Sequence, residues 1–340
     1  MAVATIIGLD IGCTSMRAVE ASHGKEGPLL TNYAEVLLPP GAVQSGVIQD
    51  PKVVTLAVRQ LRAAAPFKTK QVVLGVTNMQ AVVREMTVAN LPAKDLRASL
   101  PFQVRDLLPL PVERSVLDFL PLEEPGRGET IRGLLVAAPK EPILAAVEAV
   151  ENGGLSVLRV DLASLALLRA AARLDDQVEA IVDVGTQITT VVVHSDGVPL
   201  IVRTIPRGGA EITSALATRL GVPLPEAEAL KCRIGLWTEH GPEVADTVRE
   251  AIRPLLNEIR GSFAYLSTAG RHSQVARLVL AGGGGQLPGL TDTLADQLGL
   301  QVEQADPLSR LRRTRRTRHD GVNTVPLAAT ISIGLTLGAA

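Results

Sequence analysis

Two Asp-x-Gly turns carry the residues of this chain whose types and spacing are best suited to chemistry. Gly8–Thr14 reads GLDIGCT and Ala180–Gln187 reads AIVDVGTQ, and each turn follows an apolar strand and precedes a second β-rich segment. A tight hairpin that contains glycine points its backbone N–H groups outward with no side chain in the way, which suits phosphate oxygens. Two such hairpins facing each other would hold a polyphosphate from both sides. The candidate contacts are Gly12, Cys13, Thr14, Ser15, Gly185 and Thr186.

The acidic residues of the two turns favour a magnesium ion beside such phosphates. Asp10 and Asp183 each stand two residues before the glycine of their turn. Mg²⁺ keeps most of its water and takes few protein ligands, so two carboxylates that contact the ion through water would suffice to hold it. Arg17, on the strand after the first turn, is placed to reach the same phosphates.

Two further elements could hold a nucleoside. The segment Leu278–Leu290 reads LVLAGGGGQLPGL, and its glycines Gly282, Gly283 and Gly284 would let a flat base or a ribose lie directly against the backbone. Glu228 and Lys231 are three residues apart on an expected helix, so both polar ends share one face that could bond a ribose. The glycine pair Gly208-Gly209 completes the set of candidate nucleotide contacts.

Each of these pieces also has an ordinary structural interpretation. A single Asp-x-Gly is most often a β-turn, a glycine run is most often a flexible loop, and Glu-x-x-Lys is usually a solvated surface pair. Their order is what favours a nucleotide site: two hairpins open two lobes, the helix follows, and the glycine-rich strand end comes last.

The hydrophobic pattern predicts the elements that position these residues. Strands are expected at Thr5–Leu9, Met16–Ala21 and Gln71–Val76, with a helix at Pro51–Ala64. A β-α-β-β module follows, and the opening pattern then recurs, which indicates duplicated lobes in an α/β fold. The expected first lobe covers 1–176, with an inserted module at about 82–154 and residues 320–340 returning to it. The second lobe covers 177–319, with a helical subdomain at about 207–275.

Composition narrows the class of protein. The chain has 340 residues, a formal net charge of -1 and two cysteines, so nothing predicts nucleic-acid binding, a zinc site or a disulfide framework. The start has no signal-peptide pattern, which makes the cytosol the expected location. The apolar stretch Gly321–Ala340 is rich in small residues and interrupted by Pro326, which favours a buried helix over a membrane span.

The ordered motifs resemble the superfamily of actin, heat-shock chaperones and sugar kinases. In that comparison the two turns correspond to the two phosphate motifs and the glycine run to the adenosine motif. Val160–Leu167 and Pro326–Gly338 resemble the two connecting helices. Within the superfamily the chain is most similar to the PilM family of actin-like type IV pilus assembly proteins. The segments that carry this second resemblance are GLDIGCTSMRAVE, Leu38–Gly41, Ser45–Pro51, Pro109–Glu113, Val136–Glu141, Ala227–Lys231, GGGGQLPGL and Ile333–Leu335.

This resemblance implies a fold like that of the cell-division protein FtsA, with a small α+β domain inserted in the first lobe. It also implies binding of ATP and Mg²⁺ and contact with other inner-membrane and motor components of the pilus. The N-terminal cytoplasmic peptide of the bitopic protein PilN is expected to dock between the first lobe and the inserted domain. The chain would then lie at the inner face of the cytoplasmic membrane through its partners, with no anchor of its own, and a homo-oligomer is possible.

The sequence departs from the usual pattern of the family at two positions beside the expected phosphate site. The family usually has Ser at the position of Cys13 and Lys at that of Arg17. Asp161, on the first connector, is the candidate for orienting a hydrolytic water, although it could instead cap a helix over Leu162–Ala172. We therefore expect slow ATP turnover at most.

The arginine-rich segment Arg310–Arg318 is either a solvated loop or a contact for anionic lipid. A type II secretion platform, a polymerising actin homologue and a sugar or acetate kinase remain alternatives.

Overall fold

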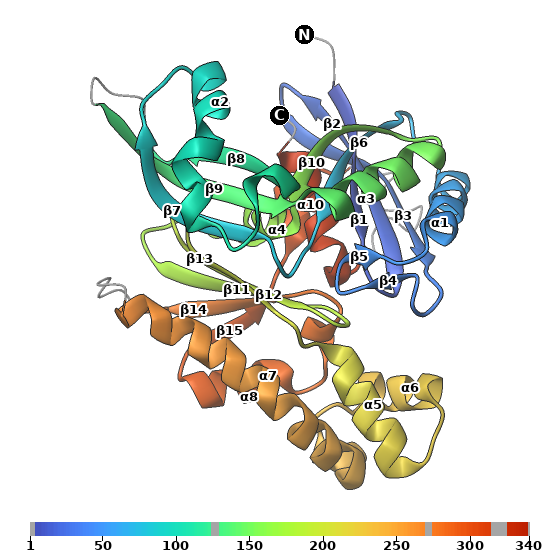
Figure 1. Cartoon of the computed structure of the whole chain (residues 1–340). Coiled ribbons are helices and arrows are strands. Elements are labelled where there is room, and N and C mark those ends of the chain that lie inside the picture. The colour runs from blue at the N-terminus through green and yellow to red at the C-terminus, as the bar shows by residue number, and fades with distance from the viewer. Residues whose placement is uncertain (1–3, 124–128, 269–273, 314–324, 339–340) are drawn as a thin grey trace.

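Two five-stranded sheets with the same strand order form the frame of the molecule (Figure 1). The computed structural model describes residues 4–123, 129–268, 274–313 and 325–338. The first sheet has the order β10-β6-β1-β2-β3 and the second the order β13-β12-β11-β14-β15. In both, the leading strand pairs antiparallel with the next strand and parallel with a later one. This duplication confirms the internal repeat.

The first lobe is built from the strands β1 (Ala4–Ile11), β2 (Ser15–Gly24), β3 (Gly27–Leu37), β6 (Gln71–Val76) and β10 (Ser156–Leu162). A two-residue turn joins the short strands β4 (Val43–Gln44) and β5 (Val47–Ile48). The helices α1 (Pro51–Ala64) and α3 (Lys140–Asn152) pack on each other beside this sheet. Asp50 begins α1 because its carboxylate accepts hydrogen bonds from the N–H groups of Lys52 and Val53.

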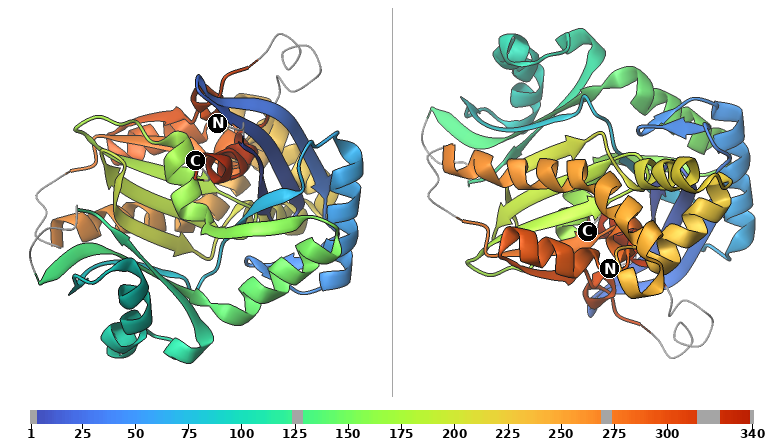
Figure 2. Two further views of the ribbon diagram at one scale, coloured as in Figure 1. Left: turned by 90° about the horizontal axis from the view of Figure 1, so that it is seen from above. Right: turned by 90° about the horizontal axis from the view of Figure 1, so that it is seen from below.

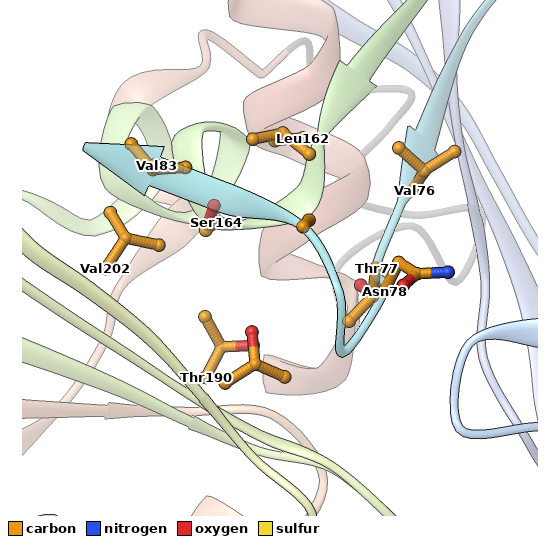
Figure 3. Close-up of a pocket in the computed structure, with 10 residues that line it drawn as sticks. Val76, Thr77, Asn78, Val83, Leu162, Ser164, Thr190 and Val202 are labelled. Atoms are coloured by element: carbon orange, nitrogen blue, oxygen red, sulfur yellow. The ribbon is translucent and has the colours of Figure 1, made fainter. Parts of the chain in front are cut away.

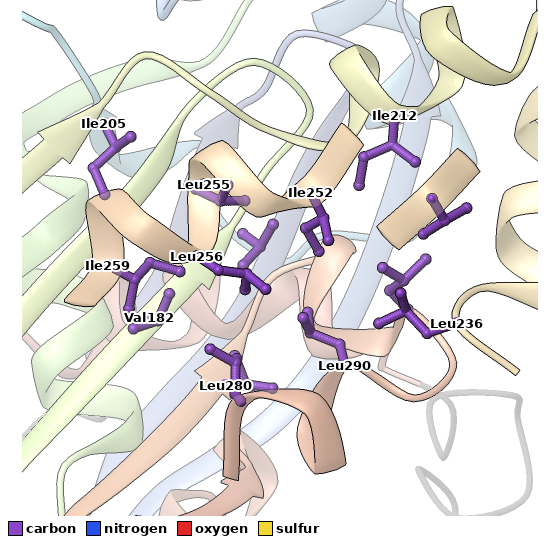
Figure 4. Close-up of a cluster of buried hydrophobic side chains, with 14 of the residues drawn as sticks. Val182, Ile205, Ile212, Leu236, Ile252, Leu255, Leu256, Ile259, Leu280 and Leu290 are labelled. Carbon is purple, nitrogen blue, oxygen red and sulfur yellow. The ribbon is translucent and has the colours of Figure 1, made fainter. Parts of the chain in front are cut away.

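The second lobe is built from the strands β11 (Val178–Val184), β12 (Thr189–Ser195), β13 (Val198–Ile205), β14 (Arg277–Ala281) and β15 (Gln301–Gln304). Its helices are α5 (Gly209–Leu220), α6 (Leu224–Ile234), α7 (Pro242–Thr268) and α8 (Leu290–Leu298). Side chains of α7 pack on the outer face of the sheet, where Ile252, Leu256 and Ile259 lie beside Val182 and Leu280 (Figure 4). The helix α7 is a single long helix that continues through Pro254.

The helices α4 (Ala163–Ala171) and α10 (Thr330–Leu337) lie between the two sheets. Their crossing is very close, because a Cβ at Gly334 would lie 1.8 Å from the carbonyl oxygen of Ala166. Only glycine permits such an approach. Nearly every side chain of α10 is buried, so the expected small-residue internal helix is confirmed. No helix in the described part of the chain is long and apolar enough to cross a membrane.

An inserted module stands beside the first lobe. It consists of α2 (Ala93–Val104) and a three-stranded antiparallel sheet in the order β7-β9-β8, made of β7 (Val82–Ala89), β9 (Thr130–Pro139) and β8 (Ser115–Pro121). Both views in Figure 2 show it at one side of the molecule, next to α3 and the second sheet. Its small core joins Leu96 and Leu100 of α2 to Leu135 of β9.

Two expected elements are confirmed to the residue, namely Pro51–Ala64 and Gln71–Val76. Short 3₁₀ turns occur at Arg105–Leu107, Val112–Arg114, Thr238–His240, Gly284–Gln286, Pro307–Arg310 and Leu327–Ala329. In the arginine-rich segment, Arg310 donates to the carbonyl of Ala172 and Arg312 pairs with Glu26. Arg315, Arg316 and Arg318 lie outside the described residues.

Candidate functional site

The two Asp-x-Gly turns fold into the same structure. In the first, the N–H of Gly12 donates to the carbonyl oxygen of Ser15 at 3.0 Å, and in the second the N–H of Gly185 donates to that of Ile188 at 2.9 Å. Both glycines are constrained, because an added Cβ would lie 3.0 Å from the Ser15 oxygen and 2.7 Å from the Ile188 oxygen. The same bond at the same place in each lobe explains why the sequence pattern recurs.

The tips of the two turns meet between the lobes. The hydroxyl oxygens of Thr14 and Thr186 are 3.3 Å apart although 172 residues separate them. The structure therefore brings the two predicted phosphate-binding turns to one place. A phosphate that lay between the tips would have to replace this hydroxyl contact with contacts of its own.

Asp10, which is buried, and Asp183, which is partly buried, form an acidic pair behind the tips. Loss of solvent and, to a lesser extent, the charge of Asp10 raise the pKa of Asp183, and the nearby Arg17 guanidinium opposes both, so that the resulting pKa is about 7. Burial also raises the pKa of Asp10. Two poorly solvated carboxylates in electrostatic contact are costly to ionise, and a divalent cation would remove that cost. In the described part of the chain no three metal-binding side chains gather, so an ion here would keep water or phosphate as its other ligands.

Polar atoms without directed hydrogen bonds lie beside this pair. The hydroxyl of Ser15 is buried with no partner among the described residues. The Nε of Arg17 lies 2.9 Å from a carboxylate oxygen of Glu35, yet its N–H is not aimed at an acceptor. Ser15 and Arg17 are two residues apart on β2, so their side chains lie on the same face of the sheet. Asp10 lies on that face too, because it pairs with Arg17 in register. Unsatisfied buried donors are rare in proteins, and here they fit an anionic ligand.

The glycine pair and the Glu-x-x-Lys helix are attached to the second turn. The N–H of Gly209 donates to the Gly185 carbonyl at 2.9 Å, and a Cβ at Gly208 would lie 2.4 Å from the same oxygen. Lys231 is buried, and its ammonium donates to the Gly209 carbonyl at 3.2 Å and to Glu228 at 2.7 Å. Lys231 therefore supports the turn from behind and already has partners.

Glu228 keeps part of its carboxylate accessible. Burial alone would raise the pKa of Glu228, but hydrogen bonds from Lys231 and Thr213 outweigh that effect and hold the pKa below its usual value. The side chain is about half exposed and ionised at neutral pH. Of the two residues expected to meet a ribose, Glu228 is the one that remains available.

The glycine run lies against Asp183 and Val184. Gly282 has a φ of +78°, and an added Cβ would lie 2.6 Å from the Asp183 carboxylate. A Cβ at Gly284 would lie 2.5 Å from the Val184 side chain, whereas a Cβ at Gly283 would meet nothing within 4 Å. Gly282 and Gly284 are therefore needed for packing, and Gly283 faces open space where a ligand could approach.

Asp161 has a different position from the one expected for a helix cap. It lies within β10, paired in parallel register with Gly75, and α4 begins only at Ala163. The helix-cap interpretation is wrong, because the strand continues past the Asp. The carboxylate forms an ion pair with Arg169, which also donates to the Gly334 carbonyl of α10 at 3.1 Å. An Asp that is engaged in this way ties the two central helices to the sheet.

The sequence interpretation missed a contact between the lobes at Gln187. Its side-chain oxygen accepts a hydrogen bond from the backbone N–H of Ser45 at 2.8 Å and one from the thiol of Cys13 at 3.4 Å. The only available signals were a polar residue after the second turn and the turn dipeptide Ser45-Gly46. Neither signal says that the two segments meet.

Two small cavities lie near the same region. One is lined by Thr77 and Asn78 of the first lobe, Ser164 at the start of α4, and Thr190 and Thr204 of the second sheet (Figure 3). The other lies between the β4–β5 turn, the end of β6 and the first turn of α3. Thr190 pairs in register with Asp183, so the first cavity adjoins the acidic pair.

Comparisons with known proteins agree with this geometry. The "PilM-PilN type IV pilus biogenesis complex" contains a chain that is 26% identical, with a TM-score of 0.86 over 98% of each chain. MreB5 of Spiroplasma citri bound to ADP has a TM-score of 0.59 at 12% identity over 98% of this chain and 95% of that one. These likenesses establish an actin-like ATPase fold.

Similarity to proteins of known sequence agrees with the structural similarity. The cell division protein FtsA of Bacillus subtilis is 22% identical over 255 residues, which are 67% of this chain and 58% of FtsA. The chain thus matches little more than half the length of that relative. The family model described as "Type IV pilus assembly protein PilM" matches residues 8–339. This chain belongs to the PilM family of type IV pilus assembly proteins.

Proposed function

We propose that this protein is an ATP-binding platform of type IV pilus assembly that docks the N-terminal cytoplasmic peptide of PilN. The observation that carries the nucleotide part is the meeting of the two matched turns at Thr14 and Thr186, with the acidic pair Asp10 and Asp183 behind them. In this account the turn N–H groups, Ser15 and Arg17 bind the phosphates. Gly283 and Glu228 lie against the nucleoside.

Magnesium would neutralise the acidic pair when ATP is bound. Asp10 and Asp183 would hold the hydrated ion, and its positive charge would balance the negative charge of the phosphates. We infer that hydrolysis is slow, because Asp161, the candidate for orienting water, is engaged by Arg169. ATP then acts as a ligand that sets the relative position of the lobes.

The partner part of the proposal rests on two apolar surfaces, one between the first sheet and α3 and one on the inserted module. The similar chain in the solved PilM-PilN complex has PilN as its partner. Here the cavity beside α3 is lined mainly by apolar residues, among them Ile48, Pro142 and Ile143. Strand β8 is also an edge of its sheet, with Val116 and Leu120 exposed. Exposed apolar residues beside an unpaired edge suit an extended peptide.

Fluorescence anisotropy with a labelled PilN peptide tests this function. The peptide is the N-terminal cytoplasmic segment of PilN from the same organism as this chain, and a scrambled peptide is the control. We expect saturable binding that weakens at least fivefold in Ile143→Asp and stays unchanged in Leu158→Asp, an exposed leucine on the edge strand β10. Equal binding of both peptides would exclude the docking proposal.

A further inference from the structure

Gln187 links the second lobe to the first beside the proposed phosphate site. It follows Thr186 at the tip of the second turn, and its side-chain oxygen accepts from Ser45 N–H at 2.8 Å, a residue 142 positions earlier. The thiol of Cys13 donates to the same oxygen. Burial raises the pKa of the Cys13 thiol, so the thiol keeps its proton at neutral pH and remains a donor.

The partner of Gln187 is a turn under backbone strain. Ser45 and Gly46 are the two residues between β4 and β5, with φ values of +46° and +76°. A non-glycine residue in this region costs about 1 kcal/mol, so contacts must hold Ser45 there. The hydrogen bond to Gln187 is one such contact.

The same turn rests on the end of β6. A Cβ at Gly46 would lie 2.0 Å from the carbonyl oxygen of Thr77, so there is no free space between the turn and that strand. Gly46 and Thr77 also line the cavity between the first sheet and α3, together with Ile143. The turn therefore touches the second lobe on one side and forms a wall of the proposed peptide site on the other.

Movement of the second turn must act on this wall. Thr14 and Thr186 are in hydroxyl contact at 3.3 Å, so phosphate oxygens that entered between them would push the two turns apart, and a shift of Thr186 would carry the adjacent Gln187 with it. Either the bond to Ser45 breaks or the Ser45–Gly46 turn follows. In both cases the wall at Gly46 changes, because it is packed directly on Thr77.

We propose that Gln187 and Ser45 form a latch through which nucleotide between the two turns controls the affinity of the adjacent cavity for the PilN peptide. The inference rests on the proposed function and adds its regulation. By thermodynamic linkage, the peptide must change the affinity for ATP by the same factor that ATP changes the affinity for the peptide.

The test measures peptide affinity with and without saturating ATP-Mg²⁺ in four proteins. Gln187→Met keeps the side-chain length and removes the acceptor, and Gln187→Glu keeps an acceptor for the Ser45 N–H. Gln44→Met makes the same chemical change on the neighbouring strand β4 as a control. In wild type and Gln44→Met we expect ATP to change the peptide Kd at least fivefold. The ratio should fall to about one in Gln187→Met and recover in part in Gln187→Glu.

Amide hydrogen exchange tests the latch without any ligand. Exchange in the segment 43–48 should be faster in Gln187→Met than in wild type and Gln187→Glu, because only the Met variant removes the side-chain oxygen that accepts from the Ser45 N–H. Equal exchange in all variants would overturn the latch.

The binding data separate the failure of the latch from that of the function. If both ligands bind wild type without coupling, or if coupling persists in Gln187→Met, the latch is wrong and the proposed function stands. If wild type binds no nucleotide, both are wrong.

Discussion

Asp183 holds in the second lobe the place that Asp10 holds in the first, and loss of solvent together with the charge of Asp10 raises the pKa of Asp183. Each of the two Asp residues stands at the end of the leading strand of its sheet, and the duplication brings the two carboxylates into electrostatic contact between the lobes. An arrangement that costs stability and leaves the Ser15 hydroxyl without a partner is characteristic of a site built for a ligand.

The acidic pair makes stability depend on pH. The folded pKa of Asp183 is about 7 against an ordinary value of 3.8, so the folded protein binds more protons than the unfolded chain between these values. Stability associated with Asp183 is complete below pH 3.8 and is lost as pH rises through 7. Without ligand, Asp183→Asn should raise stability at pH 8 by about 2–4 kcal/mol and change it little at pH 4.5. Urea unfolding at the two pH values measures this, and equal effects at both would contradict it.

Magnesium nucleotide should bind with release of protons. Binding of the cation favours the ionised carboxylates, whereas Asp183 is partly protonated near neutral pH. We expect the affinity for ATP-Mg²⁺ to rise between pH 6 and pH 8. Calorimetry in buffers of different ionisation enthalpy should report the release of about half a proton at pH 7, where Asp183 is about half protonated. This release should vanish in Asp183→Asn, and a pH-independent affinity in wild type would argue against the pair as the cation site.

Neighbouring glycines should separate packing from binding. Gly282→Ala places a Cβ 2.6 Å from the Asp183 carboxylate at a φ of +78°, so we expect a loss of stability of about 1–3 kcal/mol. Gly283 has a helical φ of -63° and open space around its Cα, so Gly283→Ala should melt like wild type. Because the added methyl group would occupy the space in which the nucleoside is proposed to lie, we expect weaker ATP binding. Thermal unfolding with and without ATP-Mg²⁺ measures both, and unchanged affinity in Gly283→Ala would count against this location.

The Asp161–Arg169 pair should matter for stability more than for turnover. Asp161→Ala leaves Arg169 half-buried beside α10 without its carboxylate partner, and we expect a loss of about 1–3 kcal/mol. Phosphate release by the purified protein should be slow in wild type and similar in the variant. Rapid release that is abolished by Asp161→Ala would instead make Asp161 a catalytic residue.

Local patterns in the sequence predicted the turns and most elements, and the limits of that prediction are physical. The Asp-x-Gly spacing is enough to predict each hairpin, because the tight turn is set by its own residues. Asp161 was misplaced because an Asp before a helical pattern looks like a cap, while pairing with Gly75 extends the strand. The burial of Lys231 under Gly209 and the bond between Gln187 and Ser45 depend on tertiary packing across distant segments. No local pattern encodes such contacts.

Calorimetric titration of the purified protein with ATP at millimolar Mg²⁺ tests the central claim most directly. We expect saturable uptake of one nucleotide per chain, at least tenfold weaker in Asp10→Ala. Absence of nucleotide uptake by the folded wild-type protein would contradict the account.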